Sequence, residues 1–355
     1  MKRVHLATAV LLAIARITAA PARAQAPPER ITVLVADGPV GKVTGAEFHG
    51  TTLFVLAAEP AGIYRAEGTR LRRWGATTTL QSPADVAVAG ERLLVRDAGR
   101  QSLATFGADG RLLATRPLPG PIASWVGMSG GDTLVTLLAF RNDSAALVRL
   151  RGAAADTLRR FAMPHPVRLM ARGSPTYSVA PPFSPTPAWA ALPGGGVAFW
   201  DGGSGAIARL DARGRPRGSV PLPRERYPVG AADREWWLND AIPQEFMGRR
   251  VFEPLRARAR TELSFPSTFP VVLALLADPA GGVWIRRTPP PGGEVWAWVD
   301  EDGTRARLRL PPGRELIAIG PAALAARSRD AAGRPVVELY RKPAPGRSGA
   351  PRSRP

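Results

Sequence analysis

The stretch LLVRDAGRQSLATF (residues 93–106) aligns without a gap with VAFWDGGSGAIARL (residues 197–210). The match continues further along the chain, because Pro-Leu-Pro at 117–119 falls on Pro-Leu-Pro at 221–223. Each copy is typical of an apolar strand, an Asp-x-Gly turn, an alternating strand, a glycine turn and a last strand. Asp and Gly suit such turns because Asp hydrogen-bonds nearby backbone and Gly tolerates a positive φ.

Weaker copies of this repeat fill the intervals at residues 45–74, 122–161, 271–310 and 316–340, which brings the count to six. A repeat of about 40–50 residues with four short strands is typical of a propeller blade. The sequence therefore predicts an all-β fold, a six-bladed β-propeller. The opening strand at residues 30–35 has no repeat of its own, and we expect it to close the ring by pairing within the last blade.

Several short motifs resemble those of known propellers. The chain resembles NHL-type repeats and the TolB-like superfamily of six-bladed propellers in three motifs: DVAV at 85–88, LLVRDAG at 93–99 and FGADG at 106–110. The chain is also similar to uncharacterised, exported six-bladed propellers of bacteria. The similar motifs are FPSTFP at 265–270, DPAGGVWI at 278–285 and RDAAGRPVVELY at 329–340. The resemblance covers nearly all of the mature chain and implies the propeller fold. Its motifs are short and apolar, so it implies no particular chemistry.

Residues 1–24 have the pattern of a secretory signal peptide. A basic start at residues 1–3 precedes a short apolar run at 4–15 and the small-x-small sequence Ala22-Arg23-Ala24, and these are the parts of such a leader. The run is too short to span a bilayer, which needs about 20 apolar residues. We expect an exported protein, periplasmic or extracellular, with no membrane span.

The composition excludes several classes of site. The chain contains no cysteine, which excludes a disulfide scaffold, a thiol nucleophile and a cysteine-based zinc site. The formal charge is +19, but nearly all positive charges are scattered arginines that accompany abundant Ala, Gly and Pro. This composition is typical of a GC-rich genome, whereas a nucleic-acid site would cluster its charge on one surface. We therefore expect no nucleic-acid partner.

The strand rhythm stops between residues 225 and 270. Residues 231–240 predict one or two helical turns with acidic residues near their start, and residues 249–262 carry alternating arginines. We expect a partly helical insertion between blades four and five, lying over one face of the disc. Its aromatic residues serve either as anchors of a partner-binding arm or as packing of the insertion onto its own propeller; they are Trp236, Trp237, Phe246 and Phe252.

Few residues qualify for catalysis or for metal binding. His49 and His165 are the only histidines beyond the leader, and neither a Gly-x-Ser-x-Gly elbow nor a His-Glu-x-x-His motif is present. Glu47 and Asp85 lie near the inner strands of the first two blades and are the acidic candidates for a metal in the central tunnel. Calcium needs six to eight oxygen ligands, and the chain has only two asparagines. We predict no cofactor, with a divalent metal as the alternative.

These observations favour a non-enzymatic binding scaffold of the bacterial cell envelope or exterior, a monomer with a protein or glycan partner. The alternative is a metal-dependent, lactonase-like or esterase-like hydrolase with its site in the propeller tunnel. A third interpretation is a binder of sugar polymers that stacks them on exposed tryptophans. The expected organisation is a leader at 1–24, a propeller at 25–341 and a disordered tail at 342–355, which is rich in Pro, Gly, Ser and Arg.

Overall fold

The computed structural model describes residues 27–75, 79–118, 122–129, 132–139, 144–151, 154–170, 176–242 and 253–344. The predicted leader at 1–24 lies outside the described residues. So do residues 345–355 of the predicted tail, and Phe246 and Phe252 of the predicted insertion.

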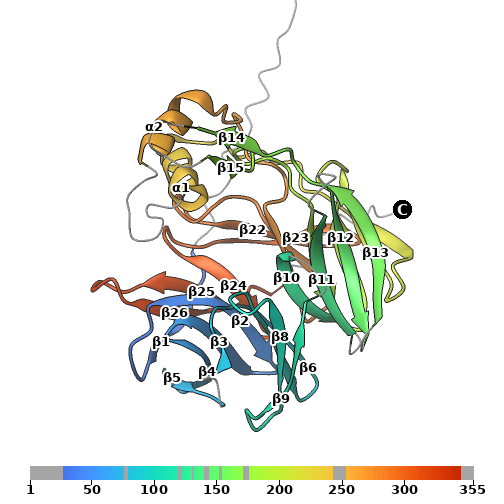
Figure 1. The fold of residues 1–355 in the computed structure, drawn as a ribbon, viewed down its shortest axis with the longest axis vertical. Helices are drawn as coiled ribbons and strands as arrows, with labels where there is room; N and C mark the ends of the chain where they lie inside the picture. Colours follow the sequence, from blue (N-terminus) through green and yellow to red (C-terminus); the bar gives the residue numbers. More distant parts are fainter. Residues whose placement is uncertain are drawn as a thin grey trace, which may run out of the picture.

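Most of the described chain is β-structure, and consecutive strands pair as antiparallel sheets of four (Figure 1). One sheet contains β6 (Pro83–Ala89), β7 (Arg92–Asp97), β8 (Ser102–Phe106) and β9 (Leu112–Pro117). The next contains β10 (Ile122–Ser129), β11 (Asp132–Ala139), β12 (Ser144–Arg151) and β13 (Ala154–Ala162). Another contains β16 (Ala188–Leu192), β17 (Gly196–Trp200), β18 (Ala206–Leu210) and β19 (Pro216–Pro221). A further one contains β20 (Ala274–Ala277), β21 (Val283–Arg286), β22 (Val295–Asp300) and β23 (Gly303–Arg309).

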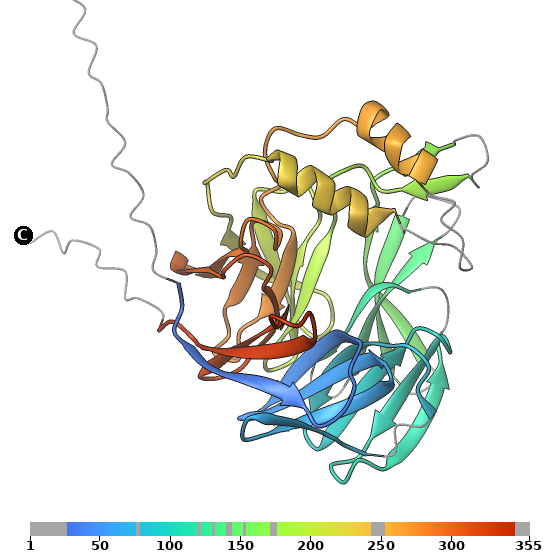
Figure 2. The ribbon, with the colours of Figure 1, turned by 90° about the vertical axis from the view of Figure 1, so that its left-hand side faces the viewer.

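The two ends of the described chain meet in one eight-stranded sheet. Its first part contains β2 (Lys42–His49), β3 (Thr52–Glu59), β4 (Ala61–Glu67) and β5 (Arg70–Arg73). Its second part contains β1 (Arg30–Ala36), β26 (Pro335–Arg341), β25 (Ala323–Arg329) and β24 (Glu315–Ile319). β1 runs antiparallel to β26, seen as blue beside red in Figure 2, and touches β5 in parallel only at Val35 and Ala36. This confirms the prediction that the opening strand pairs within the last repeat.

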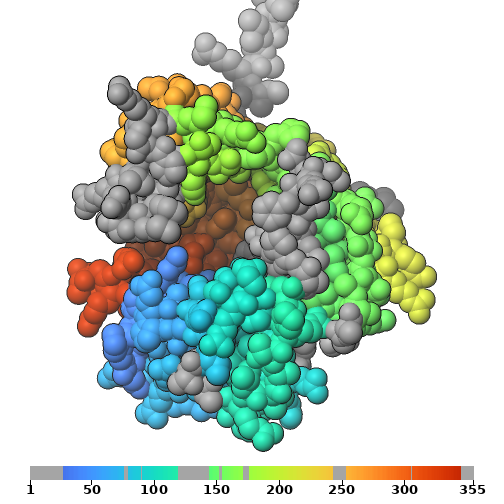
Figure 3. All heavy atoms as spheres, in the orientation of Figure 1, coloured from blue at the N-terminus to red at the C-terminus, as the bar shows by residue number. Residues whose placement is uncertain are grey.

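The first strands of the sheets follow one another in a closed ring. β2 lies beside β6, β6 beside β10, β10 beside β16, β16 beside β20, β20 beside β24, and β24 beside β2. Radial repetition of short antiparallel sheets is the architecture of a β-propeller. The arrangement leaves a channel on the axis, and Figure 3 shows the molecule hollowed among its blue, green and orange segments.

Neighbouring sheets pack face to face and share their apolar residues. Ala198 and Ile207 of one sheet, for example, belong to the same buried cluster as Val283 and Ile285 of the next. A sheet covered on both faces buries successive residues of its middle strands, which therefore read as continuous apolar runs. The runs VAFW in β17 and VWI in β21 follow this rule.

The aspartates of the repeat form turns, as the sequence predicts. The carboxylate of Asp97 accepts hydrogen bonds from the backbone N–H groups of Gln81 (2.8 Å), Ser82 (2.9 Å) and Gly99 (3.1 Å). Asp201 accepts bonds from the N–H groups of two residues that follow it, at 2.9 and 2.8 Å. Both side chains are therefore engaged in holding loops.

Two separate segments build a small layer at one side of the ring. The helices α1 (Ala231–Ala241) and α2 (Glu253–Glu262) lie between β19 and β20, whereas the hairpin of β14 (Val167–Leu169) and β15 (Tyr177–Val179) lies between β13 and β16. They share one apolar cluster that includes Leu169, Leu238 and Leu255. We call these four elements the arm (Figure 2). No helix in the described ranges is long and apolar enough to cross a membrane.

Lys342, which the sequence analysis assigns to the tail, is held by the fold. Its Nζ lies 2.6 Å from Oδ1 of Asp278, and Trp284 Nε1 donates to Oδ2 of the same carboxylate at 2.7 Å. Asp278 is almost fully buried. The ion pair attaches the end of the last sheet to its neighbour, because Asp278 follows β20.

Candidate functional site

A cavity of about 330 Å³ lies on the axis of the ring, lined by the inner strands β2, β6, β16, β20 and β24. Much of its wall consists of alanines and aliphatic side chains, which leave the space open. The charged side chains on the wall are Glu47, Asp85, Arg286, Glu315 and Arg327. A cavity that combines apolar side chains with a small number of charged groups is the usual form of a small-molecule site. We call this cavity the channel.

Glu47 projects from β2 into the channel and is half-buried. Burial raises the pKa of its carboxyl group to about 8, and a hydrogen bond from the Phe48 backbone offsets only part of that effect. No ion pair of Glu47 is found among the described residues. Its carboxyl is therefore mostly protonated at neutral pH and can donate as well as accept a hydrogen bond.

Asp85, on β6, reaches the same cavity but has a partner. The Nε of Arg96, on the adjacent strand β7, donates to Oδ2 of Asp85. Both side chains are mostly buried, at 18% exposure for Asp85 and 15% for Arg96. A carboxylate bound this closely to a guanidinium has its charge already compensated.

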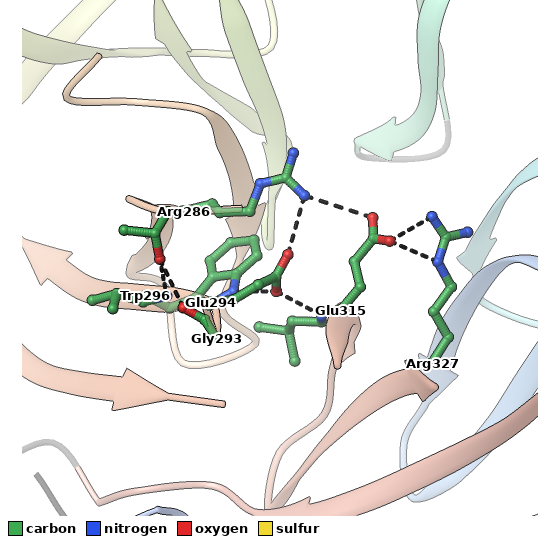
Figure 4. Close-up of polar contacts among 9 residues, drawn as sticks. Arg286, Gly293, Glu294, Trp296, Glu315 and Arg327 are labelled. Carbon is green, nitrogen blue, oxygen red and sulfur yellow. Dashed lines mark hydrogen bonds and ion pairs between the residues drawn. The ribbon is translucent and has the colours of Figure 1, made fainter. Parts of the chain in front are cut away.

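On the side of the channel formed by β21, β24 and β25, two arginines and two glutamates form a chain of contacts (Figure 4). Arg286, at the end of β21, directs Nη1 to Oε1 of Glu294 at 3.2 Å and to Oε1 of Glu315 at 3.6 Å. Arg327 of β25 grips Oε2 of Glu315 with Nε at 2.9 Å and Nη2 at 2.7 Å. Arg327 Nη1 also donates to the Val43 carbonyl of β2, at 2.9 Å. The chain thus ties the last sheets to the first.

Glu294 is the innermost member of this chain and is fully buried. Its Oε2 accepts hydrogen bonds from Trp296 Nε1 at 2.7 Å and from the Leu316 N–H at 2.8 Å. Burial raises the pKa of Glu294 to about 7, although Arg286 and these two donors oppose the rise. The preceding residue, Gly293, allows the backbone turn that leads into Glu294. Its φ of +87° suits glycine, and a Cβ at this position would lie 2.5 Å from the Leu310 carbonyl oxygen.

The channel residues do not fit a divalent cation. Asp85 and Glu315 are both neutralised by arginines, and Arg286 and Arg327 add positive charge to the same wall. Within the described ranges, no three His, Asp or Glu side chains gather as a metal would require. Glu47 and Asp85 therefore line one cavity, but they do not form a set of metal ligands there.

A second cavity, of about 180 Å³, lies under the arm, and we call it the arm pocket. Its wall includes Phe183, Trp236, Trp237 and Leu273, together with Ser184 and Arg286. Trp237 meets Phe265 edge to face, with ring centroids 5.6 Å apart. Both predicted tryptophan anchors are half-buried and contact their own chain. Arg286 lines the channel as well as the arm pocket.

The histidines lie elsewhere. His49 and His165 are exposed, and neither lines the channel or the arm pocket. His49 borders a third, open groove of about 550 Å³ together with Phe54 and Trp74.

Sequence reasoning did not identify the Arg–Glu chain or the arm pocket. One signal was present in the printed sequence: each of the residues 286, 294, 315 and 327 borders an apolar run that forms a strand. A charge beside a buried strand needs a partner. The partner's identity depends on how separate sheets meet, which the sequence does not reveal.

No family model matches the sequence, and no curated protein matches it. Similar solved structures include regucalcin, a calcium-binding protein from Agrobacterium tumefaciens, at 13% identity and a TM-score of 0.44, covering 89% of this chain and 99% of that one. A gluconolactonase from Xanthomonas campestris has 14% identity and a TM-score of 0.45, covering 86% and 87%. Virginiamycin B lyase from Staphylococcus aureus has 9% identity and a TM-score of 0.40, covering 84% and 95%. Similarities at this level assign neither a family nor an activity to the chain.

Proposed function

We propose that the chain is a six-bladed β-propeller that works as a non-enzymatic binding scaffold. In this proposal the eight-stranded sheet is two blades, which meet where β1 touches β5 over two residue pairs. The repeat of about 40–50 residues and the closed ring of inner strands support the blade count. The arm helices then form an insertion between blades four and five.

The observation that carries the binding role is the compensation of charge in the channel. Asp85 is paired with Arg96, and Glu315 with Arg327. Groups neutralised in this way stabilise the wall, and they are poor metal ligands or nucleophiles. The rigid ring and the arm instead supply two preformed cavities with apolar walls, which is what binding of a ligand requires.

The proposal also includes export. Residues 1–24 are the leader and residues 25–341 the mature domain, which meets a protein or glycan partner in the periplasm or outside the cell. N-terminal sequencing of the protein recovered from a bacterial periplasm tests this step. A mature chain that begins after Ala24 or Ala26 supports export. Recovery of the protein from the cytoplasm alone, with Met1 intact, contradicts it.

The binding role is tested by searching for turnover and for metal binding. Residues 25–355 are incubated with lactones and esters in EDTA, and then with calcium, magnesium or zinc, while thermal unfolding is followed in parallel. A ligand of the folded state at about 100 times its Kd stabilises by roughly 2.7 kcal/mol. We expect no turnover above buffer and no metal-specific rise in Tm. Metal-dependent hydrolysis that Glu47→Gln or Asp85→Asn abolishes would overturn the proposal.

A second candidate is a hydrolase that uses Glu47, and the raised pKa of Glu47 in a cavity is the observation that favours it. A carboxylic acid that stays protonated at neutral pH is suited to general-acid catalysis. This candidate predicts a rate that falls as the pH rises through about 8, and loss of that rate in Glu47→Gln. A pH–rate profile of both proteins on an ester substrate decides between the two functions.

A further inference from the structure

We propose that the arm pocket binds a small organic carboxylate whose body is a single apolar ring or a group of similar size. The inference rests on the proposed binding role and adds to it the class of ligand. It depends on three features of the pocket wall: one guanidinium edge without a protein acceptor, an unpaired hydroxyl on the same wall, and an aromatic lining.

The first feature is the unused edge of Arg286. The two carboxylates that Arg286 contacts, of Glu294 and Glu315, both face its Nη1. Its Nε is buried and has no hydrogen-bond partner among the described residues, and Nη2 points away from both carboxylates in Figure 4. The Nε and Nη2 edge is the one with which Arg327 grips Glu315. In Arg286 the same edge has no protein acceptor among the described residues, so we infer that a carboxylate in the arm pocket takes that place.

The second feature is Ser184. Its Oγ is also buried without a hydrogen-bond partner among the described residues, and it lines the same pocket as Arg286. A buried polar atom without a partner is unfavourable, and one ligand that accepts from both groups removes two such defects together. A hydroxyl and a guanidinium are both donors, so the matching group on the ligand is an acceptor.

Position distinguishes Arg286 from other arginines. Arg256 and Arg287 also have a buried Nε without a partner among the described residues. Neither of them lines the channel, the arm pocket or the groove beside His49. Among these arginines of the described chain, Arg286 is the one whose unpaired donor belongs to the wall of a cavity.

The third feature is the lining, which sets the body of the ligand. Phe183, Trp236 and Leu273 supply apolar walls around about 180 Å³. An apolar cavity of about 150 Å³ is large enough for benzene. One ring, or an aliphatic group of that size, therefore fills the pocket while its carboxylate reaches Arg286.

The charges near the pocket favour a single negative charge on the ligand. Arg286 already faces Glu294 and Glu315, and Asp240 lies on the pocket wall. A dianion such as phosphate would be repelled by these acidic groups, whereas a monocarboxylate brings one charge to one guanidinium. Glu294, with a pKa of about 7, adds negative charge as the pH rises, so binding should weaken above neutral pH.

Calorimetric titration of residues 25–355 with benzoate, phenylacetate and indole-3-acetate tests the proposal, with benzamide as the neutral match. We expect at least one carboxylate to bind and benzamide to bind at least 10-fold more weakly. Arg286→Lys keeps the positive charge but loses the two parallel N–H donors of the guanidinium, and should weaken binding about 10- to 100-fold. Ser184→Ala should weaken it several-fold, and Leu273→Trp should block it by filling the pocket.

Arg209→Lys is the matched control, because Arg209 of β18 pairs with Glu301 and lines neither the channel nor the arm pocket. It should bind like the unaltered protein, and the thermal unfolding of each variant shows whether it is folded. Equal loss in Arg209→Lys and in Arg286→Lys would mean that binding does not depend on the arm pocket, and would overturn the proposal. So would carboxylate binding that Ser184→Ala and Leu273→Trp leave intact, or no binding of any probe. Loss of this proposal leaves the scaffold function standing, since that function fails only on turnover.

Discussion

A buried glutamate has different surroundings on two sides of the channel. On the β2 side, Glu47 is half-buried and has no arginine beside it, and its pKa is raised to about 8. On the side of β21 and β24, Glu294 is fully buried and its pKa is raised to about 7. The glutamate with fewer partners thus has the more strongly raised pKa.

Hydrogen-bond donors and an opposite charge explain the smaller pKa shift of Glu294. Desolvation disfavours a carboxylate in both places, but Glu294 meets Arg286 and two N–H donors while Glu47 meets only the Phe48 backbone. The Glu294 wall is therefore a fixed network of partners. Both carboxyl groups change their proton occupancy near physiological pH, but Glu47 lines the channel with no ion-pair partner among the described residues, so it is the one that a molecule in the channel can contact.

The largest expected effect comes from removing Glu294. Glu294→Ala leaves the buried Trp296 Nε1 and the Leu316 N–H without an acceptor, and Arg286 without its nearest carboxylate. Loss of one partner from a buried charged network costs about 3–5 kcal/mol. Denaturant unfolding should show a loss of this size. Glu294→Gln keeps an acceptor oxygen and should lose about 1–2 kcal/mol; equal losses in the two variants would mean that the donors do not depend on Glu294.

The next effect is on the pH dependence of stability. In the unfolded chain Glu47 loses its proton near its ordinary pKa of 4.5, whereas in the folded protein it keeps the proton until about pH 8. The folded state therefore loses stability as the pH rises from about 4.5 to 8, by at most about 4 kcal/mol. Because water in the channel reduces that value, we expect Glu47→Gln to gain about 2 kcal/mol on the unaltered protein between pH 5 and pH 8.5.

The matched control is Glu294→Gln, measured by urea unfolding over the same pH range. The gain in the free energy of unfolding of Glu294→Gln over the unaltered protein should level off near pH 7. That is one pH unit below the corresponding point for Glu47→Gln. If the two variants gained in parallel up to pH 8, the arginine and the N–H donors would not be what separates the walls.

The strands of the ring were predictable because their signals are local. The gapless match of 93–106 with 197–210 contains strand β7 and turn Asp97 in one copy, and strand β17 and turn Asp201 in the other. Alternation and turn chemistry act over a few residues, so a repeat reveals them twice. The hairpin β14–β15 was missed because its strands have three residues each and lie in a stretch rich in proline.

The partners of the site residues were not predictable. Glu47 and Asp85 could be placed near inner strands from strand order alone. The separation of Glu294 from Leu316 is 22 residues, and that of Arg327 from Val43 is 284. Such contacts depend on how separate sheets meet around the ring. A single sequence carries the need for a partner, as a charge beside an apolar strand, but not the partner itself.

A smaller effect is expected at Asp85. Asp85→Asn replaces the charge-assisted bond to Arg96, a side chain only 15% exposed, and should cost about 1–2 kcal/mol in denaturant unfolding. The double variant Asp85→Asn with Arg96→Met completes a double-mutant cycle. A coupling energy near zero would mean that the Asp85–Arg96 pair contributes nothing to the stability of this wall.

The smallest effect on stability is expected from Glu315→Gln. This variant nevertheless gives the most direct test of why the pKa values of Glu47 and Glu294 differ. Glu315 is 28% exposed, so its loss should cost under about 1 kcal/mol. The negative charge of Glu315 is one of the causes that raise the pKa of Glu294, and it shares Nη1 of Arg286 with Glu294. Removing the Glu315 charge leaves Glu294 as the one carboxylate of this chain that contacts Arg286 Nη1, so the pKa of Glu294 should fall below about 7.

Carbon-13 NMR titration of the glutamate carboxyls measures this shift, with Glu47 on the other wall as an internal control that should stay near 8. A rise at Glu294 would mean that Glu315 positions Arg286 for it, and that geometry rather than charge separates the two walls.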